Sequence, residues 1–578
     1  MRAGDLKGIG AGEGWAIAQA WILPENEDAS VSRVAVADPE KELARLSAAI
    51  DKAATQLSAI ADKVREQAGD KEAAVFEAHE LILKDPELLA ATQEIIKSES
   101  VCAEWAISEA AQTTIHALES LDDPYLRERA VDVRDVVRRV LILLQNREVP
   151  DLSSFDHEVI VLASELTPSE VALLDREQVQ GLIFSQGSAT SHAVLIAQSM
   201  GIPCAAGIGD AGHEIKSGEW IALDGKKGRI WKMRDQMEIS EFQDRRKVYL
   251  QEREELKNWI QRPSRTADDR ELSLGANVMG VEESVRARES GADGVGLFRT
   301  EFLFIHRSEA PTENEQFEVY RSVLQKMDGR LAVIRTLDAG GDKPVPYLNL
   351  KNEENPMLGH RAIRLCLKNP DLFKTQFRAL MRAGVYGNLA VMLPMVSQRE
   401  EIVAAKKLIA EAKKELQDRG EKFTADFQLG IMIEIPAAAV MSEVLAQEVD
   451  FFSVGTNDLT QYTCAADRNN EAVRSVFNEA NPGVLKLIEM SARSAEKAGI
   501  WIGVCGAMAS RLEFLPFFLG IGISELSMVH SQIPRVRREL SRWTVEDAKR
   551  FTKDLLALGS TTEVDAFVSA RYAERPKS

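Results

Sequence analysis

The second half of the chain alternates short apolar segments with spans long enough for a helix, and it does so eight times. Eight strand-then-helix units within roughly 300 residues are typical of a (β/α)8 TIM barrel. A barrel of this kind carries its active site at the carboxyl ends of its strands, so reactive side chains are expected directly after the apolar segments. The predicted strands lie at 272–279, 294–299, 331–337, 389–393, 429–434, 451–455, 501–505 and 525–528.

Charged and polar side chains follow five of these predicted strands. Arginine guanidinium groups bind phosphate and carboxylate oxygens in pairs, and two carboxylates from adjacent strands, Glu434 and Asp458, can share a magnesium ion. The combination predicts a phosphorylated carboxylic acid as ligand. An arginine at a strand end is often only half of an ion pair and Asn-Asp often only makes a turn, but their placement at one face favours a site. The side chains concerned belong to Arg299, Arg335, Glu434, Asn457, Asp458, Arg468 and Cys505.

Cys505 has two interpretations. A free cysteine is most often a small buried apolar residue. In a barrel mouth its thiol can instead act as a general acid and deliver a proton to a carbanion or enolate. The other cysteines lie far apart without CxxC spacing, which indicates neither a disulfide framework nor a zinc site, and they are interpreted as structural: Cys102, Cys204, Cys366 and Cys464.

The first half combines a helical region with strand-like segments on both sides of it. Between Pro39 and Asn146 apolar residues recur at helical spacing, which predicts a bundle of antiparallel helices, including 71–84, 86–99, 101–119 and 127–146. The bundle contains no catalytic constellation, so it is interpreted as a recognition surface, with a purely structural insertion as the alternative. The flanking strand-like segments suggest one α/β domain that the bundle interrupts.

A histidine stands where a small-residue turn meets an apolar helix-like segment, in the stretch Gly187–Gln198. A neutral imidazole is nucleophilic at physiological pH, and a helix start offers unpaired N–H groups to an anion. His192 is therefore a candidate phosphoryl carrier. The alternative is that Thr190 or Ser191 merely caps the helix and His192 is a hydrogen-bonded surface residue. The glycine-rich segment Gly8–Gly14 is followed by an alternating, strand-like run, which disfavours a dinucleotide site.

Composition excludes several other classes of function. The 71 Lys and Arg against 90 Asp and Glu leave a net charge of −19, which opposes binding to nucleic acid or anionic lipid. The start of the chain has no apolar core of signal-peptide length, and no stretch approaches the ~20 apolar residues of a membrane helix. A soluble, cytoplasmic protein is expected.

Several long motifs make the chain resemble one family, Enzyme I of the phosphoenolpyruvate:sugar phosphotransferase system. The resemblance covers nearly the whole chain in the family's order. The motifs that carry it are Leu166–Glu170, Thr190–His192, Gly296–Leu303, Arg335–Lys343, Asn355–Gly359 and Gly455–Leu459.

The resemblance implies a role for each candidate residue. His192 matches the histidine that is phosphorylated on Nε2, and Cys505 matches the donor of the proton that converts enolpyruvate to pyruvate. Glu434 and Asp458 match the ligands of Mg²⁺. The residues that match phosphoenolpyruvate contacts are Arg299, Arg335, Asn457, Asp458 and Arg468, with Arg361 as a further expected contact.

The resemblance also implies a domain organisation. Residues 1–30 and 147–233 are expected to form a phosphohistidine α/β domain, and residues 31–146 a helical domain that binds the carrier protein HPr. Residues 234–262, which are crowded with charge, are expected to be a helical linker that permits a large swing of His192. Residues 263–578 are expected to form the phosphoenolpyruvate-binding barrel, through which a homodimer forms.

The chain departs from the family pattern near His192. The usual paired glycine is replaced by Gly187-Ser188-Ala189, and Gln198 stands where the family commonly has an arginine. The missing cation could weaken stabilisation of the phosphohistidine, so we hypothesise that Arg138 or Arg139 of the bundle compensates. The opening turn, Gly8–Gly14, also differs from the family's, which affects a turn rather than the chemistry.

Other functions share features of this sequence. A pyruvate, phosphate dikinase-like enzyme shares the phosphohistidine and barrel parts but needs a nucleotide domain, and no G-x-x-x-x-G-K-[ST] loop occurs. A nitrogen-type regulatory branch of the same system stays open, and a catalytically silent scaffold is disfavoured by the intact barrel residues.

Overall fold

The computed structural model describes residues 5–12, 14–23, 31–68, 70–120, 124–146, 155–164, 166–186, 191–305, 307–341, 345–348, 353–468 and 470–574. The chain divides into two compact units, residues 1–252 and residues 253–578. No helix within the described ranges is both long and apolar enough to cross a membrane.

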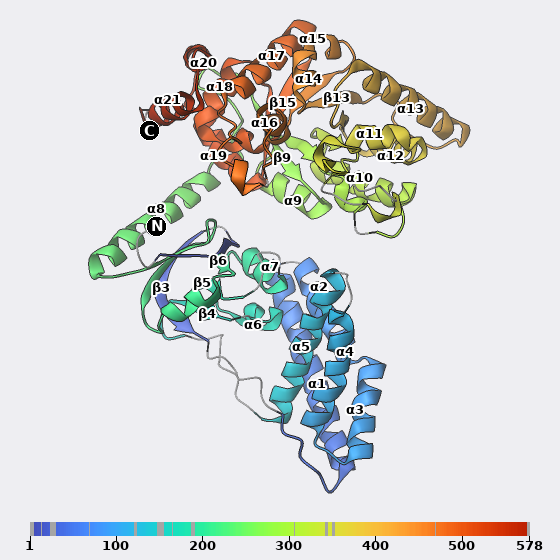
Figure 1. Ribbon diagram of the computed structural model, residues 1–578, viewed down its shortest axis with the longest axis vertical. Helices are drawn as coiled ribbons and strands as arrows, with labels where there is room; N and C mark the ends of the chain where they lie inside the picture. Colours follow the sequence, from blue (N-terminus) through green and yellow to red (C-terminus); the bar gives the residue numbers. More distant parts are fainter. Residues whose placement is uncertain are drawn as a thin grey trace. The chain divides into compact units, whose positions relative to one another are not determined.

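An elongated helical bundle makes up part of the first unit (Figure 1). Its helices are α1 (Pro39–Ala68), α2 (Asp70–Leu83), α3 (Pro86–Glu99), α4 (Ala103–Glu119) and α5 (Pro124–Leu144). The predicted helices are confirmed, with ends that shift by up to three residues. Residues at helical spacing, among them Leu46, Ala53 and Leu57, are buried, so the periodicity of the sequence corresponds to a packed face.

The strands on both sides of the bundle belong to one eight-stranded sheet, in the order β1-β8-β7-β3-β4-β5-β6-β2. Before the bundle, β3 runs in parallel beside β4, with Gln19 opposite Val159. The expected α/β domain interrupted by the bundle is therefore seen in the strand pairing. The strands are β1 (Leu6–Lys7), β2 (Ile9–Gly10), β3 (Trp15–Ile22), β4 (Val159–Ala163), β5 (Val179–Phe184), β6 (Cys204–Ala206), β7 (Trp220–Asp224) and β8 (Arg229–Lys232).

Bundle and sheet share a core. Leu57 and Val140 of the bundle and Val161 and Phe184 of the sheet belong to one buried apolar cluster. Two helices of the α/β part, α6 (Pro168–Leu173) and α7 (His192–Ser199), contribute to the same cluster. Because the burial is continuous, the bundle, the sheet and these two helices form one packed core.

The glycine-rich segment near the amino terminus packs against backbone. A Cβ at Gly10 would lie only 2.1 Å from the carbonyl oxygen of Lys226, so the close approach requires glycine there. The segment leads into strand β3 rather than a helix, as the sequence predicts. Gly10 thus permits close packing against the β7–β8 turn.

The second unit is a closed barrel of parallel strands in the order β10-β11-β12-β13-β14-β15-β16-β9. Each strand lies within a predicted one or within one residue of it, so the prediction of a TIM barrel is confirmed. The strands are β9 (Ser273–Val278), β10 (Gly294–Phe298), β11 (Ala332–Arg335), β12 (Leu389–Leu393), β13 (Gln428–Ile433), β14 (Phe451–Val454), β15 (Trp501–Val504) and β16 (Glu525–Met528).

Helices surround the barrel strands (Figure 1). Facing residues such as Phe373 and Phe377 of α12 and Leu485 and Ile488 of α17 are buried in the outer core. The helices are α9 (Val281–Glu289), α10 (Glu313–Met327), α11 (Ala362–Lys368), α12 (Pro370–Ala383), α13 (Arg399–Asp418), α14 (Pro436–Val440), α15 (Ser442–Leu445), α16 (Thr456–Cys464), α17 (Pro482–Ala498), α18 (Leu515–Gly520), α19 (Ile533–Leu540), α20 (Val545–Leu556) and α21 (Thr561–Glu574).

The charged segment before the barrel forms helix α8 (Gln236–Lys257). At its start, Ile239 and Phe242 pack against a cluster of tryptophans that includes the stacked pair Trp15 and Trp231. The chain after it is held to the barrel by the buried Arg537, which donates to the carbonyl oxygens of Trp259 (3.0 Å) and Ile260 (2.8 Å).

Candidate active site

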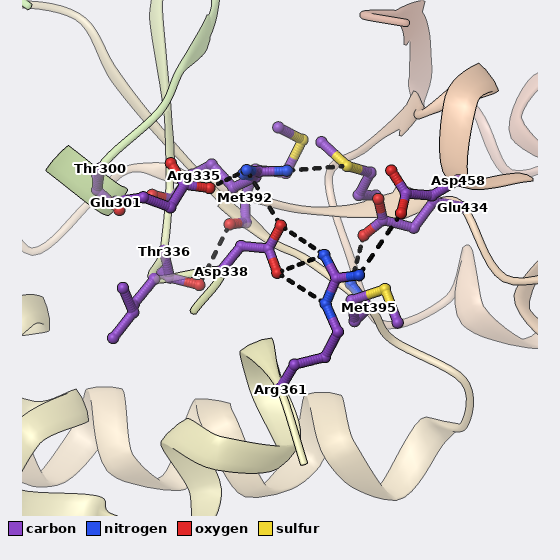
Figure 2. Close-up of polar contacts among 12 residues, drawn as sticks. Thr300, Glu301, Arg335, Thr336, Asp338, Arg361, Met392, Met395, Glu434 and Asp458 are labelled. Carbon is purple, nitrogen blue, oxygen red and sulfur yellow. Dashed lines mark hydrogen bonds and ion pairs between the residues drawn. The ribbon is translucent and has the colours of Figure 1, made fainter. Parts of the chain in front are cut away.

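The predicted barrel residues gather at the carboxyl ends of the strands. Arg335 is the last residue of β11, Glu434 follows β13 and Cys505 follows β15. Asp458 lies in the first turn of α16, which begins soon after β14. Since the strands of the closed barrel are all parallel, these residues share one mouth, and Figure 2 shows Arg335, Glu434 and Asp458 facing the same space.

Arg335 is buried between two carboxylates. Its Nη2 forms an ion pair with Glu301 and lies 3.2 Å from Asp338 Oδ2 (Figure 2). Burial by itself would lower the pKa of this guanidinium, but the neighbouring Glu301 and Asp338 outweigh it and raise the pKa. Arg335 is thus a permanently charged group with a fixed direction.

Arg361 is equally buried, at the amino end of α11. Its Nε donates to Asp338 Oδ1 (3.2 Å), and its Nη2 donates to both oxygens of the same carboxylate (2.9 and 3.0 Å). Its Nη1 donates to the hydroxyl of Tyr462 (3.3 Å) and lies 3.6 Å from Asp458 Oδ1. The structure therefore brings this expected contact into the mouth.

Two carboxylates that organise this site were not among the predicted site residues. Asp338 contacts both Arg335 and Arg361, and Glu301 pairs with Arg335. Both lie in the family motifs given above: Asp338 is three residues after Arg335, and Glu301 is two residues after Arg299. Acidic residues so close in sequence to an arginine at the end of a barrel strand are the signal that could have identified them.

Glu434 is almost completely buried. Its Oε1 accepts a hydrogen bond from the backbone N–H of Met395 (2.6 Å). Burial raises the pKa of this carboxyl, and the carboxylates of Asp458 and Asp338 raise it further against the opposing effect of Arg335 and Arg361. A carboxyl in this position favours any additional positive charge placed beside it.

The two oxygens of Asp458 have different partners, since Oδ2 accepts a hydrogen bond and Oδ1 only lies 3.6 Å from Arg361 Nη1. Its Oδ2 accepts from Arg468 Nη1 (3.2 Å), whereas its buried Oδ1 accepts no hydrogen bond within the described part of the chain. Among the residues that the structure describes, no group of three or more His, Cys, Asp or Glu is placed to hold a metal ion. Glu434 and Asp458 supply two carboxylates, which are oxygen groups of the kind that hard divalent cations prefer.

Cys505 is buried beneath the mouth. Its backbone N–H donates to Val454 (3.0 Å), and its carbonyl oxygen accepts from Asn277 Nδ2 (3.0 Å). Asn277 in turn accepts from the hydroxyl of Ser527 (2.7 Å). Burial raises the pKa of the Cys505 thiol to about 11, so the thiol is protonated at neutral pH.

The remaining predicted contacts lie around the rim. Arg299 directly follows β10, and its side chain is exposed. Asn457 Oδ1 accepts from the N–H of Ala507 (3.0 Å), which ties the start of α16 to the segment after Cys505. Arg468 is half-buried and bound to Asp458.

His192 is the first residue of α7, with Ser191 in the N-cap position. The preceding residues 187–190 and the side chain of His192 lie outside what the structure describes. Gln198 donates from Nε2 to the carbonyl oxygen of Ala11 (2.7 Å), so it ties α7 to the glycine-rich segment.

The two arginines proposed to compensate for Gln198 have partners of their own. Arg138 pairs with Glu170 (3.2 Å), the residue that closes a capping box with Thr167 at the start of α6. Arg139 donates to Gln56 (3.0 Å). Their compensating role stays a prediction.

Known proteins resemble the chain along nearly its whole length. Residues 253–545 match the family described as PEP-utilising enzyme, PEP-binding domain. Residues 7–129 match the N-terminal region of PEP-utilising enzymes, and residues 155–228 match their mobile domain.

Curated relatives carry the name phosphoenolpyruvate-protein phosphotransferase. The relative from Priestia megaterium is 41% identical over 98% of this chain and 99% of its own length. The one from Bacillus subtilis is 40% identical over 98% of this chain and 100% of its own length. The one from Geobacillus stearothermophilus is 42% identical over 99% of both.

Proposed function

This chain belongs to the phosphoenolpyruvate-protein phosphotransferase family and uses phosphoenolpyruvate to phosphorylate protein, and we propose that the phosphoryl group passes first to its own His192 and then to a histidine of HPr. Pyruvate is the other product. The observation that carries the proposal is the set of fixed arginines in the barrel mouth beside Asp458 Oδ1, a buried carboxylate oxygen that accepts no hydrogen bond from the described residues.

Phosphoenolpyruvate binds in this mouth through its phosphate and carboxylate. Arg335 and Arg361 are held in place by Asp338, so little side-chain freedom is lost when they bind the ligand. Asn457 and the rim arginines, Arg299 and Arg468, complete the contacts. Planar guanidinium groups suit both anionic ends of this substrate, because each can give two parallel hydrogen bonds.

The charges in the mouth argue for a cation as an additional component. Four guanidinium groups stand against four carboxylates around the mouth, so their charges balance before a ligand enters: Arg299, Arg335, Arg361 and Arg468 against Glu301, Asp338, Glu434 and Asp458. An anionic ligand entering this set needs further positive charge.

The family uses a metal ion, and Mg²⁺ is the ion proposed here. Glu434 and Asp458 would hold it, since they offer two hard oxygen ligands and one of these oxygens accepts no hydrogen bond from the described residues. Bound there, Mg²⁺ would neutralise charge on the transferring phosphoryl group.

The chain's own residues then carry out the transfer. A nitrogen of His192 attacks phosphorus in line with the enol oxygen, the bond between phosphorus and that oxygen breaks, and the enolate of pyruvate is left. The protonated Cys505 thiol gives its proton to C3 of the enolate, which yields pyruvate. The thiolate recovers a proton from solvent, and the phosphohistidine passes its phosphoryl group to HPr.

The other parts of the chain follow from the same proposal. The bundle within 31–146 binds HPr, and residues 1–30 and 147–233 present His192 to both phosphoryl donor and acceptor. The segment 234–262 permits His192 to alternate between the barrel of residues 263–578 and HPr. Two barrels associate in a homodimer.

Phosphoryl transfer from labelled substrate tests the proposal. The full chain is incubated with ³²P-phosphoenolpyruvate and Mg²⁺, and HPr is then added. We expect an acid-labile label on the chain that HPr removes and that His192→Ala abolishes. His157→Ala is the matched control, because His157 is an exposed histidine of the same unit. Labelling of the chain that requires ATP would overturn the proposal.

A further inference from the structure

Tyr462 occupies the face of α16 that looks toward Arg361. It lies four residues after Asp458, so the two side chains are neighbours on one face of the helix. Both reach the same nitrogen: Arg361 Nη1 is 3.3 Å from the hydroxyl of Tyr462 and 3.6 Å from Asp458 Oδ1. Tyr462 was not among the predicted site residues and has no role in the chemistry proposed above.

The hydroxyl of Tyr462 makes two different hydrogen bonds. It accepts from Arg361 Nη1 and donates to the carbonyl oxygen of Met357 (2.6 Å). A phenol is one of the few side chains that can donate and accept at one atom, so both bonds depend on that single oxygen. Tyr462 thereby connects α16, which carries Asn457 and Asp458, to the segment before α11.

That segment is shaped largely by bonds within itself. The N–H of His360 donates to the carboxylate of Glu353 (3.1 and 2.9 Å), and the N–H of Leu358 donates to Asn355 (2.9 Å). The side chain of Leu358 is 64% exposed. These bonds stabilise the conformation of the turn itself. The bond from Tyr462 to Met357 instead fixes the position of the turn relative to α16, which belongs to the β14–α16 unit of the barrel.

The two ends of the Arg361 guanidinium are held by different groups. Its Nε and Nη2 are occupied by Asp338, so Nη1 is the nitrogen that Asp338 leaves for other partners. Nη1 is held in addition by the hydroxyl of Tyr462 (3.3 Å), with Met357 Sδ at 3.6 Å. Loss of the hydroxyl leaves Arg361 charged and paired with Asp338 but removes the hydrogen-bond acceptor of Nη1 and the donor to the carbonyl oxygen of Met357.

We propose that Tyr462 is a positioning residue for phosphoenolpyruvate binding, which acts through Arg361 by fixing Nη1 and the turn at Met357. The inference rests on the proposed function, because it assigns Arg361 to the substrate. It goes beyond that function in making one hydroxyl the connection between the helix that bears Asp458 and the arginine that receives the phosphoryl or carboxylate oxygens.

The variant Tyr462→Phe tests the inference, because it removes one oxygen atom and keeps the ring. Initial rates of pyruvate formation by the full chain are measured against phosphoenolpyruvate and, separately, against Mg²⁺. We expect KM for phosphoenolpyruvate to rise about tenfold, as for a lost hydrogen bond to a charged group, with kcat changed by less than about threefold. The Mg²⁺ concentration at half-maximal rate should not change.

The rate measured against Mg²⁺ concentration distinguishes a positioning role of Tyr462 from a merely structural one. Displacement of α16 would move Asp458 and so weaken the response to Mg²⁺ together with substrate binding. Tyr386→Phe is the control, because Tyr386 lies in the turn before β12 and contacts Arg321 rather than the mouth. A double-mutant cycle on substrate affinity adds Arg361→Lys, in whose presence Tyr462→Phe should lose most of its effect.

Two results would overturn the inference while the proposed function stands: an unchanged KM in Tyr462→Phe, or a parallel loss of the Mg²⁺ response. A wild-type chain that takes no label from phosphoenolpyruvate would overturn the proposed function, and the inference with it.

Discussion

Asp338 and Arg361 form a bidentate ion pair, in which Nη2 of the arginine lies 2.9 Å from Oδ1 and 3.0 Å from Oδ2 of the carboxylate. The same carboxylate reaches Arg335 at 3.2 Å (Figure 2). One buried acid thus orients two arginines, and a substrate anion meets cations that are already in position.

Asp338→Asn should weaken substrate use strongly. The amide keeps the shape, but it loses the charge and turns an N–H₂ group toward two guanidinium groups. Breaking one partner of a buried charge pair costs about 2–4 kcal/mol, so we expect kcat/KM for phosphoenolpyruvate to fall roughly 30- to 1,000-fold. Steady-state rates of pyruvate formation measure this. Asp371→Asn is the control, since the Asp371 side chain is 98% exposed. Tighter substrate binding by Asp338→Asn would contradict the prediction, because it would mean that Asp338 competes with the ligand for the arginines.

Glu434→Gln should raise the requirement for Mg²⁺. The amide oxygen can still accept from Met395 N–H, so the local structure is kept while the charge is lost. We expect at least about tenfold more Mg²⁺ at half-maximal rate, and EDTA should abolish activity of the wild-type chain reversibly. Titration of the rate with MgCl₂ measures both effects. Glu443→Gln, at a mostly exposed side chain, should behave as wild type; an identical Mg²⁺ curve for Glu434→Gln would contradict the assignment.

Cys505→Ala should slow pyruvate formation by about 10²- to 10⁴-fold and leave the Kd for phosphoenolpyruvate nearly unchanged, as expected when a general acid is removed. Calorimetric binding and a coupled pyruvate assay separate the two quantities. Cys464→Ala is the control thiol. Loss of binding in Cys505→Ala would argue against a proton donor.

Because burial raises the pKa of Cys505 to about 11, its deprotonation should not reduce the wild-type rate below about pH 10.

Glu525→Gln should change how the stability of the barrel depends on pH. Burial raises the pKa of Glu525 to about 7, and Asp293 adds to the shift. Three glycines surround this side chain, and a Cβ at Gly275 would lie 2.8 Å from its Oε1. Below about pH 4.5 the carboxyl is protonated in both states and costs nothing. Between about pH 4.5 and pH 7 the unfolded state releases the proton while the folded state keeps it, so the stability of the folded state falls as pH rises and levels off above about pH 7.

The wild type should therefore lose about 3 kcal/mol relative to Glu525→Gln between pH 4.5 and pH 8, from the difference between the two pKa values. Hydrogen exchange of barrel peptides in the full chain, compared at both pH values, measures it. Glu546→Gln, at an exposed position on α20, should leave the wild-type pH dependence intact. Parallel curves for wild type and Glu525→Gln would refute the assignment.

The sequence by itself was enough to predict the two architectures and to place several candidate site residues at the barrel mouth. Helix and strand periodicities are local properties, so the bundle of α1–α5 and the strands of the barrel could be located without knowing any long-range contact. Arg335, Glu434 and Cys505 follow from the same reasoning, since in a parallel barrel the residue after each strand must come to one mouth. Family motifs supplied Arg361, which no strand end indicated.

Only the tertiary structure decided which charges meet. Asp338 is 23 residues from Arg361, and Tyr462 is 101 residues from it, and both bond to the same guanidinium. Gln198 is a second example. In the sequence it only marks the absence of the family's arginine, whereas in the structure its side-chain amide donates a hydrogen bond to the carbonyl oxygen of Ala11, 187 residues away. Periodicity tells which face of an element is buried, but the partner of a buried charge depends on distances of about 3 Å between side chains of different elements, which arise only when those elements are packed.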